Sequence, residues 1–248
     1  MNQIITHKTD LMRRLLHLVS HGYDYWTSGE ILPNKVEALA LKFLDRYHTN
    51  RTEMQRHRAK KRDEANTQLV MWQDQTDKQS SVYWWLLATK GDGLIHQFEK
   101  LAMIRDSRPT LTGYELVMTS RKRREKDQPE KKLKPSWTWR MDAPTFEGWK
   151  ERIKTAVRHN SDNQIRQALH SLGRVPGFRE CRAQAYLLFR MMRGDWKRTQ
   201  KGDFPYSLPV IKFCGRHQKA QTVTTTEVAK KAKRQRIKQP TKETVATL

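Results

Sequence analysis

Cysteine is scarce in this chain, which contains only Cys181 and Cys214 among its 248 residues. The two do not form a Cys-x-x-Cys pair, so a zinc site of the usual cysteine-rich kind is excluded. A disulfide between them stays open, but two free thiols in a reducing compartment are the favoured interpretation.

Long apolar runs are also missing from the sequence. The longest covers residues 82–88, whereas a helix that spans a bilayer needs about 20 apolar residues. The first residues contain no apolar core of the signal-peptide kind. We therefore expect a soluble cytoplasmic protein without membrane contact.

The common enzyme motifs are absent as well. The sequence has no GxxxxGK[ST] phosphate loop, no HExxH zinc helix, no GxSxG nucleophile turn, and no two histidines separated by one apolar residue. We assign no catalytic residue, no cofactor and no metal ligand. A metal-independent ribonuclease needs only a base, an acid and cationic groups, and the sequence contains these residue types. That activity is therefore not excluded, but no spacing of these residues supports it.

Acidic residues are few relative to basic ones. Forty-nine Lys and Arg face 26 Asp and Glu, which gives a formal net charge of +23. A polyanion would relieve the resulting self-repulsion, and clustered Lys and Arg are typical of nucleic-acid-binding proteins. We expect a nucleic-acid partner, with DNA favoured over RNA; the alternative is a charged surface without function.

The hydrophobic pattern predicts an α+β protein. Helical periodicity covers 9–21, 34–48 and, in three stretches, 145–193, whereas 68–73, 81–89, 112–120 and 136–141 have strand composition. We interpret 23–29 as an aromatic turn, 94–103 as a short helix and 208–213 as a possible strand.

Four parts follow from this pattern. They are a helical part (1–64), a small antiparallel sheet (65–141), a basic helical part (142–221) and a disordered basic tail (222–248). Helices would thus flank the sheet from both ends of the chain. The region 65–120 is close to neutral, so the basic excess lies outside it.

The predicted helix over 178–193 is the most informative basic segment. Apolar side chains recur along one side at helical spacing, and the other side carries an aromatic and four arginines with no acid among them. Such a stripe could follow a phosphate backbone and stack a base. The binding residues expected here are Arg179, Arg182, Tyr186, Arg190 and Arg193. The alternative is the ordinary solvated face of an amphipathic helix.

Two further basic blocks are candidate contacts. One is the loop between two predicted strands, with Arg121, Lys122, Arg123 and Arg124. It could enter a groove or clamp a strand, or it could only protect a sheet edge. The other block, Arg56–Arg62, follows Thr52 on a predicted helix and could track phosphates. The binding residues expected in it are Arg58, Lys60, Lys61 and Arg62.

Several short segments carry a resemblance. They are Gly22–Gly29, Lys42–Tyr47, Gly113–Val117, Trp137–Arg140 and Pro176–Gln184. In these the chain resembles poorly characterised basic proteins encoded on bacterial plasmids and integrative conjugative elements. The resemblance implies a role in mobile-element replication, transfer, maintenance or defence, and it implies no catalytic residues.

We therefore expect a DNA-binding accessory protein of a mobile element. One alternative is an RNA-binding or metal-independent RNA-processing protein of a defence system. Another is a structural subunit of a nucleoprotein complex, with other protein subunits as partners.

Overall fold

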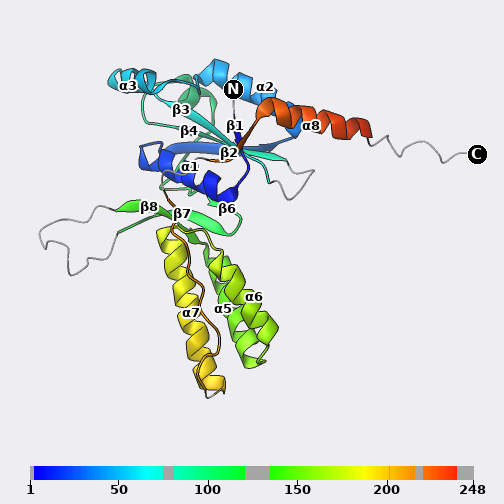
Figure 1. Ribbon diagram of the computed structural model, residues 1–248. Helices are drawn as coiled ribbons and strands as arrows, with labels where there is room; N and C mark the ends of the chain where they lie inside the picture. The colour runs from blue at the N-terminus through cyan, green and yellow to red at the C-terminus, as the bar shows by residue number, and fades with distance from the viewer. Residues whose placement is uncertain (1–2, 75–80, 121–134, 201, 216–219, 239–248) are drawn as a thin grey trace, which may run out of the picture. The chain divides into compact units, whose positions relative to one another are not determined.

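The computed structural model of the protein describes residues 3–74, 81–120, 135–200, 202–215 and 220–238 (Figure 1). The α+β class is confirmed, with one six-stranded and one three-stranded sheet. The chain divides into two compact units: a first unit of Met1–Ser107 with Gln218–Leu248, and a second unit of Arg108–His217. Strands expected to form one small sheet over 65–141 are divided between these units.

The first unit contains the larger sheet and most of the shorter helices. Its elements are β1 (Gln3–Ile5), α1 (Lys8–Ser20), β2 (Tyr25–Ile31), the 3₁₀ turn η1 (Pro33–Lys35), α2 (Val36–Tyr47), α3 (Glu53–Lys61), β3 (Thr67–Trp72), β4 (Val82–Ala88), α4 (Leu94–Phe98), β5 (Ala102–Met103), β9 (Thr222–Thr224) and α8 (Thr225–Lys238).

The larger sheet is mixed, not purely antiparallel as expected. Its strand order is β5-β2-β4-β3-β1-β9, and β1 pairs in parallel with β3 while the other neighbours are antiparallel. The crossover through α1 runs from β1 to β2, and the crossover through α2 and α3 returns from β2 to β3. Connections between parallel strands are almost always right-handed. These two connections cross the sheet in opposite directions, so their helices lie on opposite faces of the sheet. Figure 1 shows α1 and α2 on the two faces of the sheet.

Strand β2 corrects the prediction of an aromatic turn over 23–29. Strand β2 (Tyr25–Ile31) pairs along its whole length with β4, and Gly29 lies opposite Trp84. A Cβ atom at Gly29 would come within 2.6 Å of the Trp84 ring, so only glycine leaves room for that indole. Trp84 in turn packs edge-on against Phe43 of α2, with ring centroids 5.3 Å apart. Phe43 and Trp84 therefore belong to the core of the first unit.

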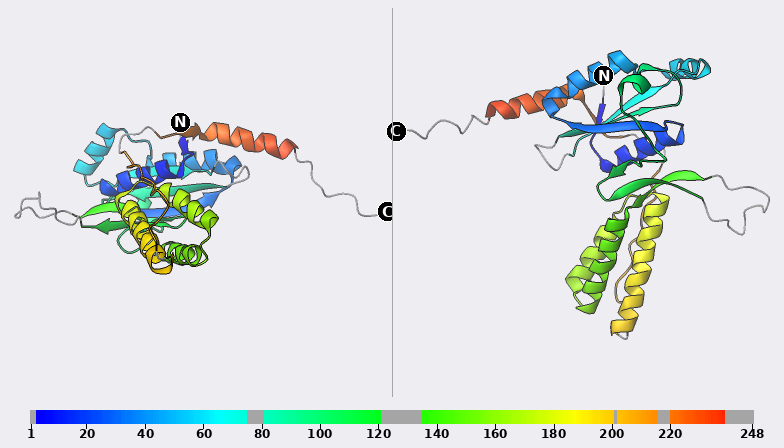
Figure 2. Two further views of the ribbon diagram at one scale, coloured as in Figure 1. Left: turned by 60° about the horizontal axis from the view of Figure 1, so that its bottom comes forward. Right: turned by 180° about the vertical axis from the view of Figure 1, so that it is seen from behind.

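The C-terminal segment also differs from expectation. The prediction of a disordered tail from residue 222 is wrong for 222–238, which form β9 on β1 and helix α8 beside α2 (Figure 2). Val228 and Ala229 are buried there. Two apolar side chains are too few for a helical pattern in sequence, but they suffice against a surface already formed by α2 and η1. Residues 239–248 lie outside the described part.

The second unit joins a small sheet to three helices. Its elements are β6 (Thr110–Leu111), β7 (Tyr114–Thr119), β8 (Ser136–Met141), α5 (Ala143–Arg158), α6 (Asp162–Gly173) and α7 (Arg179–Gln200). The strands pair antiparallel in the order β6-β7-β8, and the predicted helices within 145–193 are confirmed. Asp142 caps α5 by accepting a hydrogen bond from the Thr145 amide at 2.9 Å.

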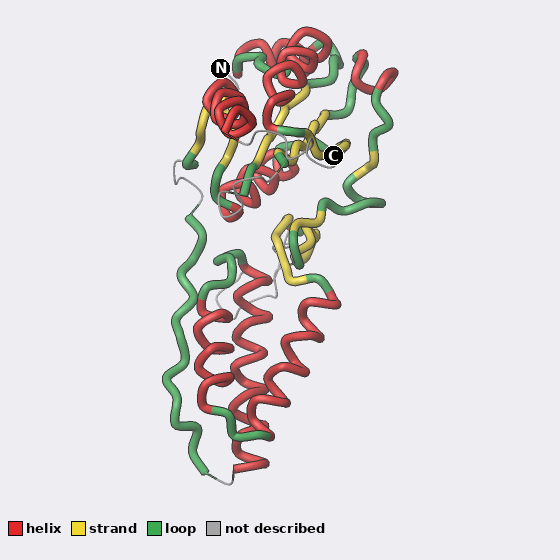
Figure 3. Tube along the Cα trace, turned by 90° about the vertical axis from the view of Figure 1, so that its right-hand side faces the viewer, coloured by secondary structure: helices red, strands yellow, loops and turns green. Residues whose placement is uncertain are grey.

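The segment after α7 is extended but is not the strand predicted for 208–213. It runs along the helices (Figure 3), and Ile211 is buried in their core. Gly177 permits this approach, because a Cβ atom there would lie 2.1 Å from the Lys212 carbonyl oxygen. Among the helices that the structure describes, none combines the length and apolar character needed to cross a membrane.

Candidate nucleic-acid interface

Arg179, the first predicted contact on α7, is engaged within the second unit. Its guanidinium donates to Thr119 of β7, to the Ser136 hydroxyl of β8 at 3.3 Å, and to Glu180 at 3.0 Å. These bonds tie the start of α7 to both strands of the hairpin. The side chain thus has a structural task that its place in an arginine stripe did not reveal.

Arg182 and Tyr186 support the extended segment after α7. The Arg182 guanidinium lies 5.8 Å from the Phe213 ring centroid, and its buried Nε has no hydrogen-bond partner among the described atoms. The Tyr186 hydroxyl accepts a hydrogen bond of 3.4 Å from the Ile211 amide. Both side chains therefore face their own chain rather than solvent alone.

Arg190 and Arg193 are the predicted α7 arginines that remain exposed. Neither forms an ion pair or side-chain hydrogen bond with any residue in the described ranges. Their role in binding stays a prediction. The loop with Arg121, Lys122, Arg123 and Arg124 lies outside the described residues, although the strands that it joins pair up to Thr119 and Ser136.

Helix α3 carries the third predicted block, and its first turn explains why it forms. The Thr52 hydroxyl accepts from the Gln55 amide at 3.3 Å, and the Gln55 side chain accepts from the Thr52 amide at 2.8 Å. This capping box satisfies two amides that would otherwise lack partners. Only Ala59 of α3 is buried, so nearly the whole helix faces solvent.

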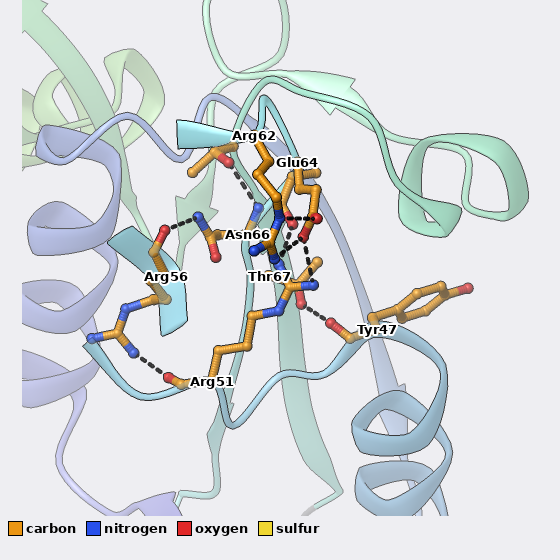
Figure 4. Close-up of polar contacts among 9 residues, drawn as sticks. Tyr47, Arg51, Arg56, Arg62, Glu64, Asn66 and Thr67 are labelled. Carbon is orange, nitrogen blue, oxygen red and sulfur yellow. Dashed lines mark hydrogen bonds and ion pairs between the residues drawn. The ribbon is translucent and has the colours of Figure 1, made fainter. Parts of the chain in front are cut away.

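The four predicted residues of this block differ in their partners. Arg62 binds Glu64 at 2.7 Å, and Arg51 reaches the same carboxylate at 3.3 Å (Figure 4). The hydrogen bond from Arg62 is the main cause that lowers the pKa of Glu64, and Arg51 adds to it. Arg58, Lys60 and Lys61 are exposed, and their side chains have no ion pair within the described part of the chain.

A pocket of about 750 Å³ lies between α3 and α1. Each helix presents positions i, i+3, i+4 and i+7 to it, which is one helical face. The floor comes from the start of β3, and Thr89 and Lys90 line the pocket after β4. The lining residues of the helices and floor are Arg14, His17, Leu18, His21, Glu53, Arg56, His57, Lys60, Asn66 and Gln68.

Two guanidinium groups of this pocket bind only neutral acceptors. Arg14 donates to the Gln68 side chain at 2.7 Å, and Arg56 donates to the Arg51 carbonyl at 2.6 Å. Neither contacts a carboxylate in the described residues. Burial lowers the pKa of Arg14, Tyr23 raises it, and the positive charge of Arg56 lowers it further. The two cations therefore repel each other across the pocket.

Tyr23 and Asn66 add uncharged polar groups to the same place. The Tyr23 side chain is 6% exposed, and burial raises its pKa against the opposing charges of Arg56 and Arg14, so its hydroxyl stays protonated. Asn66 is 5% exposed and donates from Nδ2 to the Arg56 carbonyl at 3.1 Å (Figure 4). Its Oδ1 is buried without a hydrogen-bond partner among the described atoms.

His17 of α1 and His21, the residue that caps the end of α1, form a pair that lines the pocket. The rings of His17 and His21 lie 4.1 Å apart, and His21 Nδ1 donates to the His17 carbonyl at 2.6 Å. Partial burial, then His21, then Arg14 lower the pKa of His17. His17 is therefore neutral near pH 7 and would gain a proton beside an anion.

Sequence reasoning found the basic block of α3, which begins at Arg56, but missed the residues that complete the pocket. The missed residues are Arg14, His17, His21, Tyr23 and Asn66. One signal was readable: Arg14, His17 and His21 follow each other at helical spacing on the polar side of the helix predicted over 9–21. The described residues contain no group of three or more side chains that could hold a metal ion.

Comparisons with protein-family models, curated proteins and solved structures found no match. No family therefore assigns a role to these residues, and the resemblance to mobile-element proteins stays a prediction.

Proposed function

We propose that the protein binds nucleic acid, with DNA as the expected ligand, through α3 and the pocket between α3 and α1. The observation that carries the proposal is the pair Arg14 and Arg56, two partly buried cations with neutral partners only. Cations that leave water are costly unless an anion compensates. Phosphate is the anion whose oxygens match a guanidinium fork.

The exposed cations of α3 extend this site. Arg58, Lys60 and Lys61 stand on a helix with a single buried residue, so a phosphate backbone can approach without steric hindrance from the fold. Such contacts supply affinity that falls steeply with salt. The exposed Arg190 and Arg193 of α7 are proposed as a weaker second contact.

The biological setting is part of the proposal. The chain resembles mobile-element proteins, and an accessory DNA-binding role in replication, transfer or maintenance, in the cytoplasm, accords with its charge of +23. No described constellation demands chemistry on the bound strand, so binding alone is proposed.

Fluorescence anisotropy with matched single-stranded DNA, duplex DNA and an RNA hairpin, at two salt concentrations, tests the proposal. The variant Lys60→Glu with Lys61→Glu should weaken DNA binding by more than about tenfold, because each contact with a charged partner is worth about 1.5–3 kcal/mol. The matched control is Lys35→Glu with Lys42→Glu, which makes the same charge change at exposed positions away from the pocket.

Equal losses in the two variants would overturn the assignment, because overall charge would then explain all binding. Tighter binding of the RNA hairpin than of either DNA at both salt concentrations would overturn DNA as the ligand. Circular dichroism of each variant verifies that the fold is intact.

A further inference from the structure

The charge of the pocket between α1 and α3 bears on which phosphate it accepts. A phosphodiester within a strand carries one negative charge, whereas a terminal phosphate carries about 1.5 to 2 at pH 7. Arg14 and Arg56 bring two positive charges, and no carboxylate contacts either of them in the described part of the protein. The other charged residues that line the pocket are Lys60, Lys90, Glu53, Asp63 and Glu64, and Glu64 is paired with Arg51 and Arg62. With that pair set aside and the histidines counted as neutral, the lining keeps an excess of two positive charges. A group with nearly two negative charges neutralises this excess, while a diester leaves half of it uncompensated.

The neutral groups fit the rest of a nucleotide. The Tyr23 hydroxyl is a protonated donor, suited to a phosphate oxygen. The buried Oδ1 of Asn66 is an acceptor without a partner among the described atoms, and a sugar hydroxyl or a base amino group could supply the missing donor. The volume of about 750 Å³ lies within the range of small-molecule sites, so one nucleotide has room.

We infer that the pocket between α1 and α3 binds the terminal phosphate of a DNA strand together with its nucleotide. Arg14 and Arg56 hold the phosphate oxygens, Tyr23 donates to them, and Asn66 accepts from the nucleotide. This inference rests on the proposed function, because it says which part of the nucleic acid the pocket takes.

The test compares one single-stranded oligonucleotide with a 5′-phosphate, a 3′-phosphate or hydroxyls at both ends, with the dye in the middle of the strand. At least one phosphorylated form should bind about tenfold more tightly than the hydroxyl form. Arg14→Gln and Arg56→Gln should each bring that ratio close to one, and Tyr23→Phe should reduce it. The control Lys42→Gln should keep the ratio of the unchanged protein.

The outcomes separate the two proposals. If none of the three strands binds, the proposed function fails. If all three bind equally, the proposed function stands and the inference about the strand end is overturned. If a variant unfolds, competition on the unchanged protein decides: deoxyadenosine monophosphate should displace the phosphorylated strand and deoxyadenosine should not. Displacement by inorganic phosphate at the same concentration as the nucleotide would overturn the strand-end assignment in favour of a free-phosphate site.

Discussion

The two helices α3 and α7 are both rich in basic residues and differ in what their cations contact. Helix α7 buries Cys181, Ala185, Leu188, Phe189, Met192 and Trp196, and its first arginine binds the neighbouring strands. Helix α3 buries Ala59 alone, and its four Arg and Lys residues have no ion pair in the described residues. Charge density along a sequence therefore does not distinguish an arginine that holds the fold from one that is free for a ligand.

The largest difference should appear in stability at two arginines of α7. Arg179→Ala removes the bonds to Thr119 and Ser136, and should lower the free energy of unfolding by about 1–2 kcal/mol, allowing for partial exposure. Arg190→Ala should change it by less than about 0.5 kcal/mol, since that side chain is exposed. Urea unfolding followed by tryptophan fluorescence measures both. Equal effects would remove the distinction within α7.

A smaller effect is expected at the cap of α3. Thr52→Ala removes the hydroxyl that accepts from the Gln55 amide and should cost the helix about 1 kcal/mol. Because α3 buries so little, the loss should be local: amides of α3 should exchange faster while the midpoint of global unfolding stays nearly constant. Thr52→Ser keeps the acceptor and is the control. A clear fall in the global midpoint would mean that α3 is part of the core.

The sequence predicts most of this secondary structure where apolar periodicity is strong. Helix α2 and the three helices of the second unit were expected because their buried faces repeat at helical spacing. Strand β2 was missed because Gly29 and the aromatics resemble a turn, and only pairing with β4 shows why glycine is needed there. Helix α8 was missed because its burial depends on a surface made by residues far away in the chain.

Part of the candidate site could likewise be predicted from the sequence, and part could not. The cations of α3 are visible as a block of charge in the sequence. The pocket is not, because Arg14, Tyr23, Arg56 and Asn66 come from four places that meet only after the sheet forms. Whether Arg14 and Arg56 have acidic partners is likewise a property of the fold, and that property distinguishes the pocket from the start of α7.

The smallest effect concerns protonation at the pocket. His17 shares the pocket with titratable and charged groups from several elements. Those from α1 and the residues after it are Arg14, His21 and Tyr23, those from α3 are Glu53, Arg56, His57 and Lys60, and the others are Asp63, Glu64 and Lys90. The pKa of His17 is lowered in the free protein, and a bound phosphate would favour the charged imidazole. The complex then binds more protons than the free protein, so affinity must rise as pH falls.

We therefore expect the advantage of a phosphorylated strand over a hydroxyl-ended strand to grow a few-fold between about pH 8 and pH 6.5. Below about pH 6 the phosphate itself takes up a proton and the trend should level off. His17→Gln should flatten the profile, and His159→Gln, an exposed histidine of the second unit, should not. Anisotropy titrations at constant ionic strength measure the ratio. Equal slopes for His17→Gln and the unchanged protein would exclude His17 as the group that takes up a proton when the phosphate binds. A flat profile in both proteins would show that no histidine of the pocket changes its protonation on binding.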